Sequence, residues 1–220
     1  MLEAAVAALL PPGIAVAVRD PALPVDQGEV FASEAAEMAR AVPKRRAEFF
    51  AGRAAAHQAM RALGHLPTPV AMGKDRAPVW PDGLSGSISH CAGACVALMA
   101  EASRYRALAV DIEPDADLPV EVIGVVCLPS ERAWLAELPV LDRGRMARLI
   151  FSAKETVYKL QYPITGKMLD FSDVEIVVNV DDERFDARFT APYAPDFADA
   201  LLAGWFGREG GKVFSVMFAE

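Results

Sequence analysis

Two carboxylates stand two positions apart in the segment Asp111-Ile112-Glu113, directly before Pro114. If this segment ends a strand, side chains at positions i and i+2 point to the same face. Like charges so close repel each other unless a cation bridges them. Carboxylate oxygens suit Mg²⁺, which usually takes one or two carboxylates together with waters and substrate phosphates. The pair therefore indicates a metal site, although the spacing by itself favours the simpler alternative of a solvated strand end.

A third carboxylate lies in the segment Phe151–Lys159, where two lysines accompany it. On a helix, Glu155 and Lys159 share a face at i and i+4. Lys154 projects about 100° away from Glu155, so it can border the same pocket. Such a carboxylate could ligate a metal while the lysines hold phosphate oxygens. The alternative, which this segment alone favours, is a surface ion pair worth about 0.3–0.5 kcal/mol.

Two further segments offer donors for phosphate groups. Ser89 and His90 follow a Gly/Ser turn, and their side chains could donate hydrogen bonds to phosphate oxygens. Arg45 and Arg53 are close to two helical turns apart and share a face, and guanidinium groups suit a terminal phosphate. Each segment alone favours a simpler alternative, a structural histidine or a solvated basic helix face.

The elements that must carry these residues follow an α+β pattern. Helices are expected after an N-cap at Ser33, after Pro43 with Gly64 as the stop, and after an N-cap at Ser130. The expected helices span residues 33–41, 44–63, 120–126, 130–138 and 142–161. The expected strands span residues 14–18, 87–90, 94–100, 107–113, 174–180, 184–190, 201–207 and 213–218. The region 67–86 is rich in Pro and Gly and is predicted to be a loop.

Each half of the sequence therefore holds a long helix and several strands. This pattern predicts two similar α/β halves related by a pseudo-twofold axis, each with a long helix on a small, mostly antiparallel sheet. The active site is expected in the cleft between the halves. The boundary near residues 101–106 gives an N-terminal half of residues 1–105 and a C-terminal half of residues 106–220.

Composition excludes several classes of protein. The chain has 220 residues, of which 53% are hydrophobic, so it is not disordered. Its formal net charge of -8 argues against general nucleic-acid binding, which needs a basic surface. No apolar run approaches the ~20 residues that span a bilayer, and the start, with Glu3 and no cationic residue, does not resemble a signal peptide. The odd number of cysteines indicates reduced thiols and a cytoplasmic protein, and a monomer is expected.

Taken in this order, the segments resemble the 4′-phosphopantetheinyl transferase superfamily, in particular its short bacterial branch typified by the enterobactin synthetase component D. The matching segments are spread over more than half of the chain, from residue 45 to residue 171, and are Arg45–Arg53, Ala77–Gly83, Gly86–Cys91, Val110–Glu113, Phe151–Lys159 and Leu169–Phe171. Each segment is degenerate, but the ordered set is specific. Val110 departs from the family pattern, in which a small residue usually precedes the Asp-x-Glu pair.

The resemblance implies roles for the matched residues. It implies a Mg²⁺ site made by Asp111, Glu113 and Glu155, with the backbone of Ile112 close to the ion. It also makes Glu155 the candidate general base, directly or through a water, and Lys159 the group that stabilises or protonates the leaving oxygen. The implied coenzyme A contacts are Arg45 and Arg53 at the 3′-phosphate, Met72, Gly73, Lys74 and Asp75 beside the nucleotide, Ser89, His90, Lys154 and Lys159 at the pyrophosphate, Asp111 and Glu155 through the metal, and Leu169 along the pantetheine arm.

The implied reaction transfers 4′-phosphopantetheine from coenzyme A to a serine of an apo acyl or peptidyl carrier protein, with Mg²⁺, and releases adenosine 3′,5′-bisphosphate. The implied partners are coenzyme A and the carrier of a siderophore, nonribosomal peptide or polyketide pathway, and neither nucleic acid nor a membrane. Two alternatives remain open. One is a coenzyme A-binding module without transfer activity. The other is an unrelated Mg²⁺-dependent phosphatase, which would leave the helix with Arg45 and Arg53 unexplained.

Overall fold

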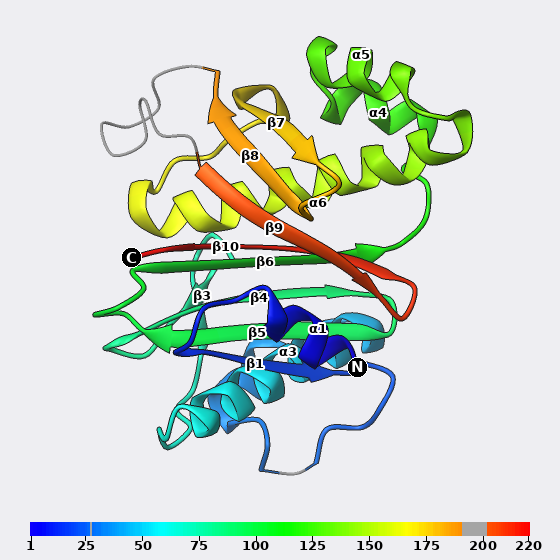
Figure 1. The fold of residues 1–220 in the computed structure, drawn as a ribbon. Helices are drawn as coiled ribbons and strands as arrows, with labels where there is room; N and C mark the ends of the chain where they lie inside the picture. Colours follow the sequence, from blue (N-terminus) through cyan, green and yellow to red (C-terminus); the bar gives the residue numbers. More distant parts are fainter. Residues whose placement is uncertain (27, 191–201) are drawn as a thin grey trace.

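The computed structural model describes residues 1–26, 28–190 and 202–220 and contains antiparallel sheets covered by helices (Figure 1). The first sheet has the order β1 (Ile14–Arg19), β5 (Ala94–Glu101), β4 (Leu84–Cys91). The second has the order β6 (Ala107–Pro114), β10 (Lys212–Ala219), β9 (Leu202–Glu209), β8 (Arg184–Phe189), β7 (Val174–Asn179). A short hairpin pairs β2 (Ala71–Met72) with β3 (Pro78–Val79). The predicted α+β class is confirmed.

Two long helices cover the sheets. The helix α3 (Pro43–Ala62) packs on β1 and β5, and α6 (Val140–Thr165) packs on β6 and β10 (Figure 1). The shorter helices are α1 (Leu2–Ala8), α2 (Ala32–Glu37), α4 (Val120–Val126), α5 (Pro129–Glu137) and the 3₁₀ turn η1 (Phe171–Asp173). Across the described ranges, no helix combines the length and apolar character that crossing a membrane requires.

Apolar packing connects the two sheets as well as each sheet to its helix. Val96 and Leu98 of β5 share one buried cluster with Leu108 and Ile112 of β6 and Phe214 of β10. Burial of side chains of this size is worth roughly 1.5–3 kcal/mol each. The two sheets therefore share a core, and β6 is fixed against the first sheet on this side.

Serine hydroxyls join the neighbouring edges of β4 and β6. Ser85, Ser87 and Ser89 alternate along β4 and therefore face the same side. The Ser87 Oγ accepts a hydrogen bond from the Val110 N–H at 3.1 Å, and the Ser89 Oγ accepts one from the Ile112 N–H at 3.3 Å. These side chains supply the partners that a backbone ladder would otherwise give to β6, and they place Ser89 beside the carboxylate end of this strand.

Two of the predicted helix starts are wrong, and for the same reason. The expected caps at Ser33 and Ser130 lie inside the helices, because α2 begins after Phe31 and α5 after Leu128. In α2 the Glu34 carboxylate accepts the Phe31 N–H at 2.8 Å, and α5 has the same arrangement, in which a glutamate three residues on accepts the Leu128 N–H at 2.6 Å. A glutamate at the third helical position caps each start.

The helix predicted over 142–161 is longer in the structure, spanning residues 140–165. It continues through Pro163, which has no N–H for the carbonyl of Lys159. It ends at Gly166, whose φ of 64° belongs to the left-handed region that glycine adopts without strain.

Three other regions differ from the sequence prediction or meet the limit of the described residues. The segment Leu2–Ala8, for which no element was predicted, is a helix whose Val6 is fully buried. The predicted loop 67–86 contains the β2–β3 hairpin and the first residues of β4. The strand predicted at 201–207 corresponds to β9, which begins at Leu202, and residue 201 lies outside the described residues.

Candidate active site

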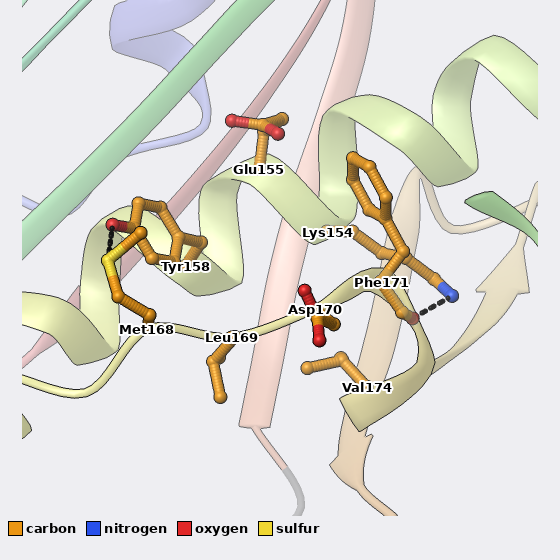
Figure 2. Close-up of a pocket in the computed structure, with 8 residues that line it drawn as sticks. All are labelled: Lys154, Glu155, Tyr158, Met168, Leu169, Asp170, Phe171 and Val174. Atoms are coloured by element: carbon orange, nitrogen blue, oxygen red, sulfur yellow. Dashed lines mark hydrogen bonds between the residues drawn. The ribbon is translucent and has the colours of Figure 1, made fainter. Parts of the chain in front are cut away.

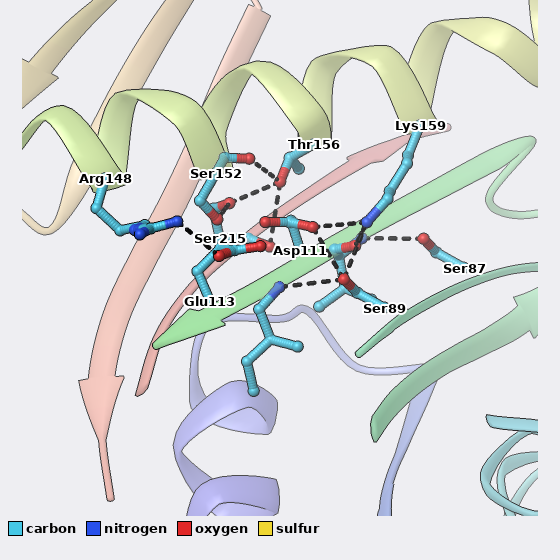
Figure 3. Close-up of polar contacts among 11 residues, drawn as sticks. Ser87, Ser89, Asp111, Glu113, Arg148, Ser152, Thr156, Lys159 and Ser215 are labelled. Carbon is cyan, nitrogen blue, oxygen red and sulfur yellow. Dashed lines mark hydrogen bonds and ion pairs between the residues drawn. The ribbon is translucent and has the colours of Figure 1, made fainter. Parts of the chain in front are cut away.

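Asp111 of β6 is the buried centre of a polar group between the two sheets and α6 (Figure 3). Its Oδ1 accepts hydrogen bonds from the Lys159 ammonium at 2.7 Å and from the Ser89 hydroxyl at 2.9 Å. Its Oδ2 is buried and has no partner among the described residues. A buried carboxylate oxygen without a partner carries a desolvation cost, so this atom is available to a ligand.

Lys159 of α6 faces three acceptors around this carboxylate. Besides Asp111, its ammonium donates to the Ser89 hydroxyl at 3.0 Å and to the Val110 carbonyl at 3.2 Å. The side chain is 24% exposed, so one end of the site opens to solvent. The structure thus brings together Ser89, Asp111 and Lys159, three residues that lie in separate parts of the sequence.

The other two predicted acidic residues lie on either side of Asp111 in different surroundings. The Arg148 guanidinium donates to Glu113 Oε2 at 3.0 Å. Burial raises the pKa of Glu113 to about 7, the Asp111 charge adds to this, and Arg148 opposes it. Burial likewise raises the pKa of Glu155, with Lys159 opposing the shift and Asp111 adding to it. Within the described ranges Glu155 makes no hydrogen bond to another side chain.

The acidic residues fit a magnesium ion in chemistry, although they do not form a complete cage. Among the described residues, no three His, Cys, Asp or Glu side chains are grouped closely enough to hold a metal ion. Mg²⁺ needs only one or two carboxylates when water and substrate phosphates complete its shell. The unpartnered Oδ2 of Asp111 and the unbonded Glu155 provide such oxygens. Ile112 can contribute only through its backbone, since its side chain is fully buried in the core.

Arg45 and His90 meet at the edge of the same region. The exposed Arg45 Nη1 donates to His90 Nε2 at 2.9 Å, and the other ring nitrogen lies 3.9 Å from a Glu48 carboxylate oxygen. Burial lowers the pKa of His90, Glu48 opposes the shift, and Arg45 adds to it. A neutral His90 that accepts from Arg45 fits this arrangement.

Arg53 lies on the same helix but in a different environment from Arg45. It is buried, its guanidinium carbon lies 4.2 Å from the centroid of the Phe49 ring, and its Nε has no partner among the described residues. Burial lowers the pKa of Arg53, while Glu34 and Glu37 oppose the shift. A buried cation with an unbonded donor is suited to an anion.

The predicted nucleotide loop is anchored at both ends. The Met72 N–H donates to a Glu37 carboxylate oxygen at 3.0 Å, and the Tyr162 hydroxyl of α6 donates to Asp75. A Cβ at Gly73 would lie 2.6 Å from Asp75 Oδ1 and 3.2 Å from the Ala77 carbonyl oxygen, so a larger residue would displace the Asp75 side chain. The loop that includes Met72, Gly73, Lys74 and Asp75 is therefore tied to both α2 and α6, with Lys74 exposed at its tip.

Two pockets lie beside α6 and share Tyr158. The larger, of about 660 Å³, is bounded by the segment 75–80, by 86–88 of β4, and by Tyr158, Lys159 and Tyr162 among others. The smaller, of about 280 Å³, is formed by Lys154, Glu155, Tyr158, Met168, Leu169, Asp170, Phe171 and Val174 (Figure 2). The predicted acid Glu155 and the predicted pantetheine contact Leu169 thus border the same pocket.

Comparisons with known proteins agree with this geometry. The sequence model of the 4′-phosphopantetheinyl transferase N-terminal domain matches residues 33–100, and that of the 4′-phosphopantetheinyl transferase superfamily matches residues 107–200. The chain is 44% identical to 4′-phosphopantetheinyl transferase Svp of Streptomyces mobaraensis, over 81% of this chain and 73% of that protein. The chain belongs to the 4′-phosphopantetheinyl transferase superfamily.

Other relatives lie in the same superfamily. The chain is 37% identical to 4′-phosphopantetheinyl transferase PptT of Mycobacterium tuberculosis, over 72% of this chain and 69% of that protein. It is 30% identical to enterobactin synthase component D of Escherichia coli O157:H7, over 76% of this chain and 82% of that protein. The predicted superfamily and enzyme class are confirmed: this chain is a 4′-phosphopantetheinyl transferase.

Lys154, which is predicted to contact the pyrophosphate together with Ser89, His90 and Lys159, has no bond to the Asp111 group in this transferase. Lys154 is buried, and its ammonium pairs with Glu131 Oε2 at 2.8 Å. It also donates to the carbonyls of Val126 at 2.8 Å and Phe171 at 2.9 Å. Lys154 lines the smaller pocket, but its ammonium shares no bonding partner with the ammonium of Lys159.

The sequence interpretation missed several residues that support the site. Ser215 lies opposite Asp111 in the pairing of β10 with β6. Its hydroxyl bonds to those of Ser152 at 2.8 Å and Thr156 at 2.6 Å, both on α6 (Figure 3). A lone serine in the apolar run 213–218 was a signal of this network, whereas nothing in the local sequence marked Arg148 as the partner of Glu113.

Proposed function

We propose that this transferase moves the phosphopantetheine group of coenzyme A to a serine hydroxyl of an apo carrier protein, depends on Mg²⁺, and releases adenosine 3′,5′-bisphosphate. The observation that carries the proposal is the Asp111 carboxylate, which is held by Lys159 and Ser89 on one oxygen and unbonded on the other. Transfer of a charged phosphoryl group needs this combination of a cation site, hydrogen-bond donors and alignment.

The metal would be held by Asp111 and Glu155, with the Ile112 backbone nearby and Glu113 as a weaker candidate. Glu113 is assigned last because Arg148 already neutralises it, and a water can take its place. When bound, Mg²⁺ neutralises charge on the phosphate oxygens.

In the proposed chemistry a bond forms between the serine oxygen and the β-phosphorus, and the bond from that phosphorus to the bridging oxygen breaks. Glu155 takes the serine proton, directly or through a water, and its raised pKa favours this role. Lys159 donates a hydrogen bond or its proton to the leaving oxygen. Ser89 and His90 are further contacts for the pyrophosphate.

Two regions would hold the arms of coenzyme A. Arg53, buried with an unbonded Nε, and Arg45 would hold the 3′-phosphate, beside the nucleotide loop of residues 72–75. The pantetheine arm would run along Leu169 in the smaller pocket. This arrangement supports an active site in a cleft between two pseudo-symmetric halves, residues 1–105 and 106–220, each with a long helix on an antiparallel sheet.

The relatives suggest the class of carrier. Several bear the name enterobactin synthase component D, which favours carriers of siderophore, nonribosomal peptide or polyketide synthesis. We further propose that the enzyme acts as a cytoplasmic monomer, a setting that suits the three free cysteines Cys91, Cys95 and Cys127.

The test is incubation of the protein with coenzyme A, Mg²⁺ and a panel of apo carriers, read by mass spectrometry of the carrier. The proposal expects a gain of one phosphopantetheine group, lost when the carrier serine is replaced by alanine or when EDTA is present. Binding of coenzyme A without any mass gain on the panel would instead favour a coenzyme A-binding module. Release of inorganic phosphate from coenzyme A would favour a phosphatase.

A further inference from the structure

The Lys154 ammonium is enclosed by protein acceptors. An ammonium has three N–H donors, and Lys154 has three acceptors in the Glu131 carboxylate and the carbonyls of Val126 and Phe171. The side chains of Lys154 and Glu131 are 2% and 1% exposed. Lys154 could reach a phosphate only by leaving Glu131 as an unpaired buried charge, which is strongly unfavourable.

Glu131 extends this contact to two more elements. Its Oε2 also accepts the Leu128 N–H at 2.6 Å, and its Oε1 accepts the Ile176 N–H at 2.8 Å. One buried ion pair therefore links the end of α4, the start of α5, the turn η1 and strand β7 to α6. The shared function of these bonds is to fix backbone, since all but the ion pair itself end on main-chain atoms.

The backbone fixed in this way is a wall of the smaller pocket. The segment Met168–Phe171 lines that pocket together with Glu155 and Tyr158, and Phe171 is the last residue of the segment (Figure 2). The Phe171 ring also packs against Phe151, with ring centroids 5.7 Å apart. Lys154 holds the carbonyl at this point, so its loss would release the wall, whereas the bonds of Asp111 to Lys159 and Ser89 do not involve Lys154.

We propose that Lys154, together with Glu131, is a positioning residue that holds the Leu169–Phe171 wall and thereby sets the affinity for the pantetheine arm of coenzyme A, without contacting phosphate. This inference rests on the proposed function, because it assigns the smaller pocket to that arm. Lys154 acts through Phe171 and not on the substrate. A ligand that shares the nucleotide but lacks the arm must therefore be insensitive to it.

The experiment compares two ligands by calorimetry in the presence of Mg²⁺: coenzyme A and adenosine 3′-phosphate 5′-diphosphate, which has all three phosphates of coenzyme A and no pantetheine. The variants are Lys154→Met, Glu131→Gln and the double variant, in which no buried charge remains. Arg184→Met, which removes a half-exposed cation of β8 in the same half of the chain, is the control. A further variant, Leu169→Ala, alters the wall itself and keeps the ion pair.

The double variant is expected to bind coenzyme A about tenfold more weakly, whereas its affinity for adenosine 3′-phosphate 5′-diphosphate should stay within about twofold of wild type. Leu169→Ala should show the same selective loss, and Arg184→Met should show none. If Lys154→Met alone fails to fold, Glu131→Gln and the double variant carry the comparison.

Three results would overturn the proposal. Equal losses for both ligands would mean that Lys154 contacts phosphate, as the sequence motif predicts. Unchanged affinity for both ligands in a folded double variant would leave the pair a purely structural role. If wild type itself binds neither ligand, the proposed function fails and this inference fails with it. This outcome is distinguishable from failure of the inference alone, in which wild type still binds coenzyme A.

Discussion

Two lysines of helix α6 form ion pairs of nearly the same length that differ in the exposure of the lysine and in how many carboxylate oxygens are bonded. Lys154 and Glu131 lie 2.8 Å apart, and Lys159 and Asp111 lie 2.7 Å apart. In the first pair both side chains are almost fully buried, and Glu131 uses both oxygens. In the second, Lys159 is 24% exposed, and one oxygen of Asp111 has no partner among the described residues. The distance between charges does not separate a structural pair from a functional one, whereas the satisfaction of each polar atom does.

The largest expected effect is in the region of the partly exposed Lys159–Asp111 pair, where Glu155 is the proposed base. Glu155→Gln removes the proposed base and one metal oxygen with little change in volume. Transfer to an apo carrier should fall by at least about 10³-fold, because both proton transfer and charge stabilisation are lost. Binding of coenzyme A should remain measurable by calorimetry. Turnover near that of wild type would remove Glu155 from the mechanism.

The fully buried Lys154–Glu131 pair should affect the free energy of unfolding. Lys154→Met leaves Glu131 charged and buried, which costs about 3 kcal/mol of unfolding free energy. Adding Glu131→Gln should restore most of this loss, because the unpaired charge is gone. Urea unfolding followed by tryptophan fluorescence measures both variants. Additive destabilisation in the double variant would show that the two residues do not form the buried pair.

Glu113 forms a third ion pair, with Arg148. The dependence of stability on pH should reveal the titration of Glu113. Its pKa rises to about 7 in the folded protein, above an ordinary value of 4.5. The folded state therefore holds this proton more tightly, so the associated stability is present below pH ~4.5 and is lost as the pH rises through 7.

In buffer with EDTA, wild type should lose about 2 kcal/mol of unfolding free energy between pH 5 and pH 8 from this group. Glu113→Gln should flatten that part of the profile. An identical slope in the variant would mean that Glu113 does not titrate in this range.

The smallest expected effects concern the 3′-phosphate. Arg53→Ala should raise the KM for coenzyme A about tenfold, in line with loss of one charge-assisted contact, and should change the KM for dephospho-coenzyme A little. Arg45→Ala removes the exposed arginine of the same helix that is assigned to the same phosphate, and it should show the same selective increase. Equal increases with both substrates would contradict the assignment of these arginines to the 3′-phosphate.

Local periodicity explains which parts of this molecule could be predicted. The positions i and i+2 on β6, and i and i+4 on α6, are properties of the chain itself, so Asp111, Glu113, Glu155 and Lys159 could be assigned to faces without a structure. The α+β class followed from the same patterns, and the family followed from the order of the motifs.

Partners distant in sequence could not be predicted in this way. Lys154 stands next to Glu155 in the chain, but its contact with Glu131 depends on the packing of α5 against α6. The helix starts were mistaken because serine is a common cap, whereas Glu34 and Glu131 cap their helices from inside. The partner of Lys154 and the capping residue of each helix depend on which side chains become buried together, and the order of residues in the sequence does not show this.

The single-turnover rate of Asp111→Asn with coenzyme A, Mg²⁺ and an apo carrier tests the central claim most directly. The asparagine oxygen can still accept from Lys159 and Ser89, so the unfolding free energy should change by less than about 1 kcal/mol. The rate should fall by about 10³-fold, because the negative charge of Asp111 and its unbonded carboxylate oxygen are lost. A variant that transfers at the wild-type rate would contradict the account.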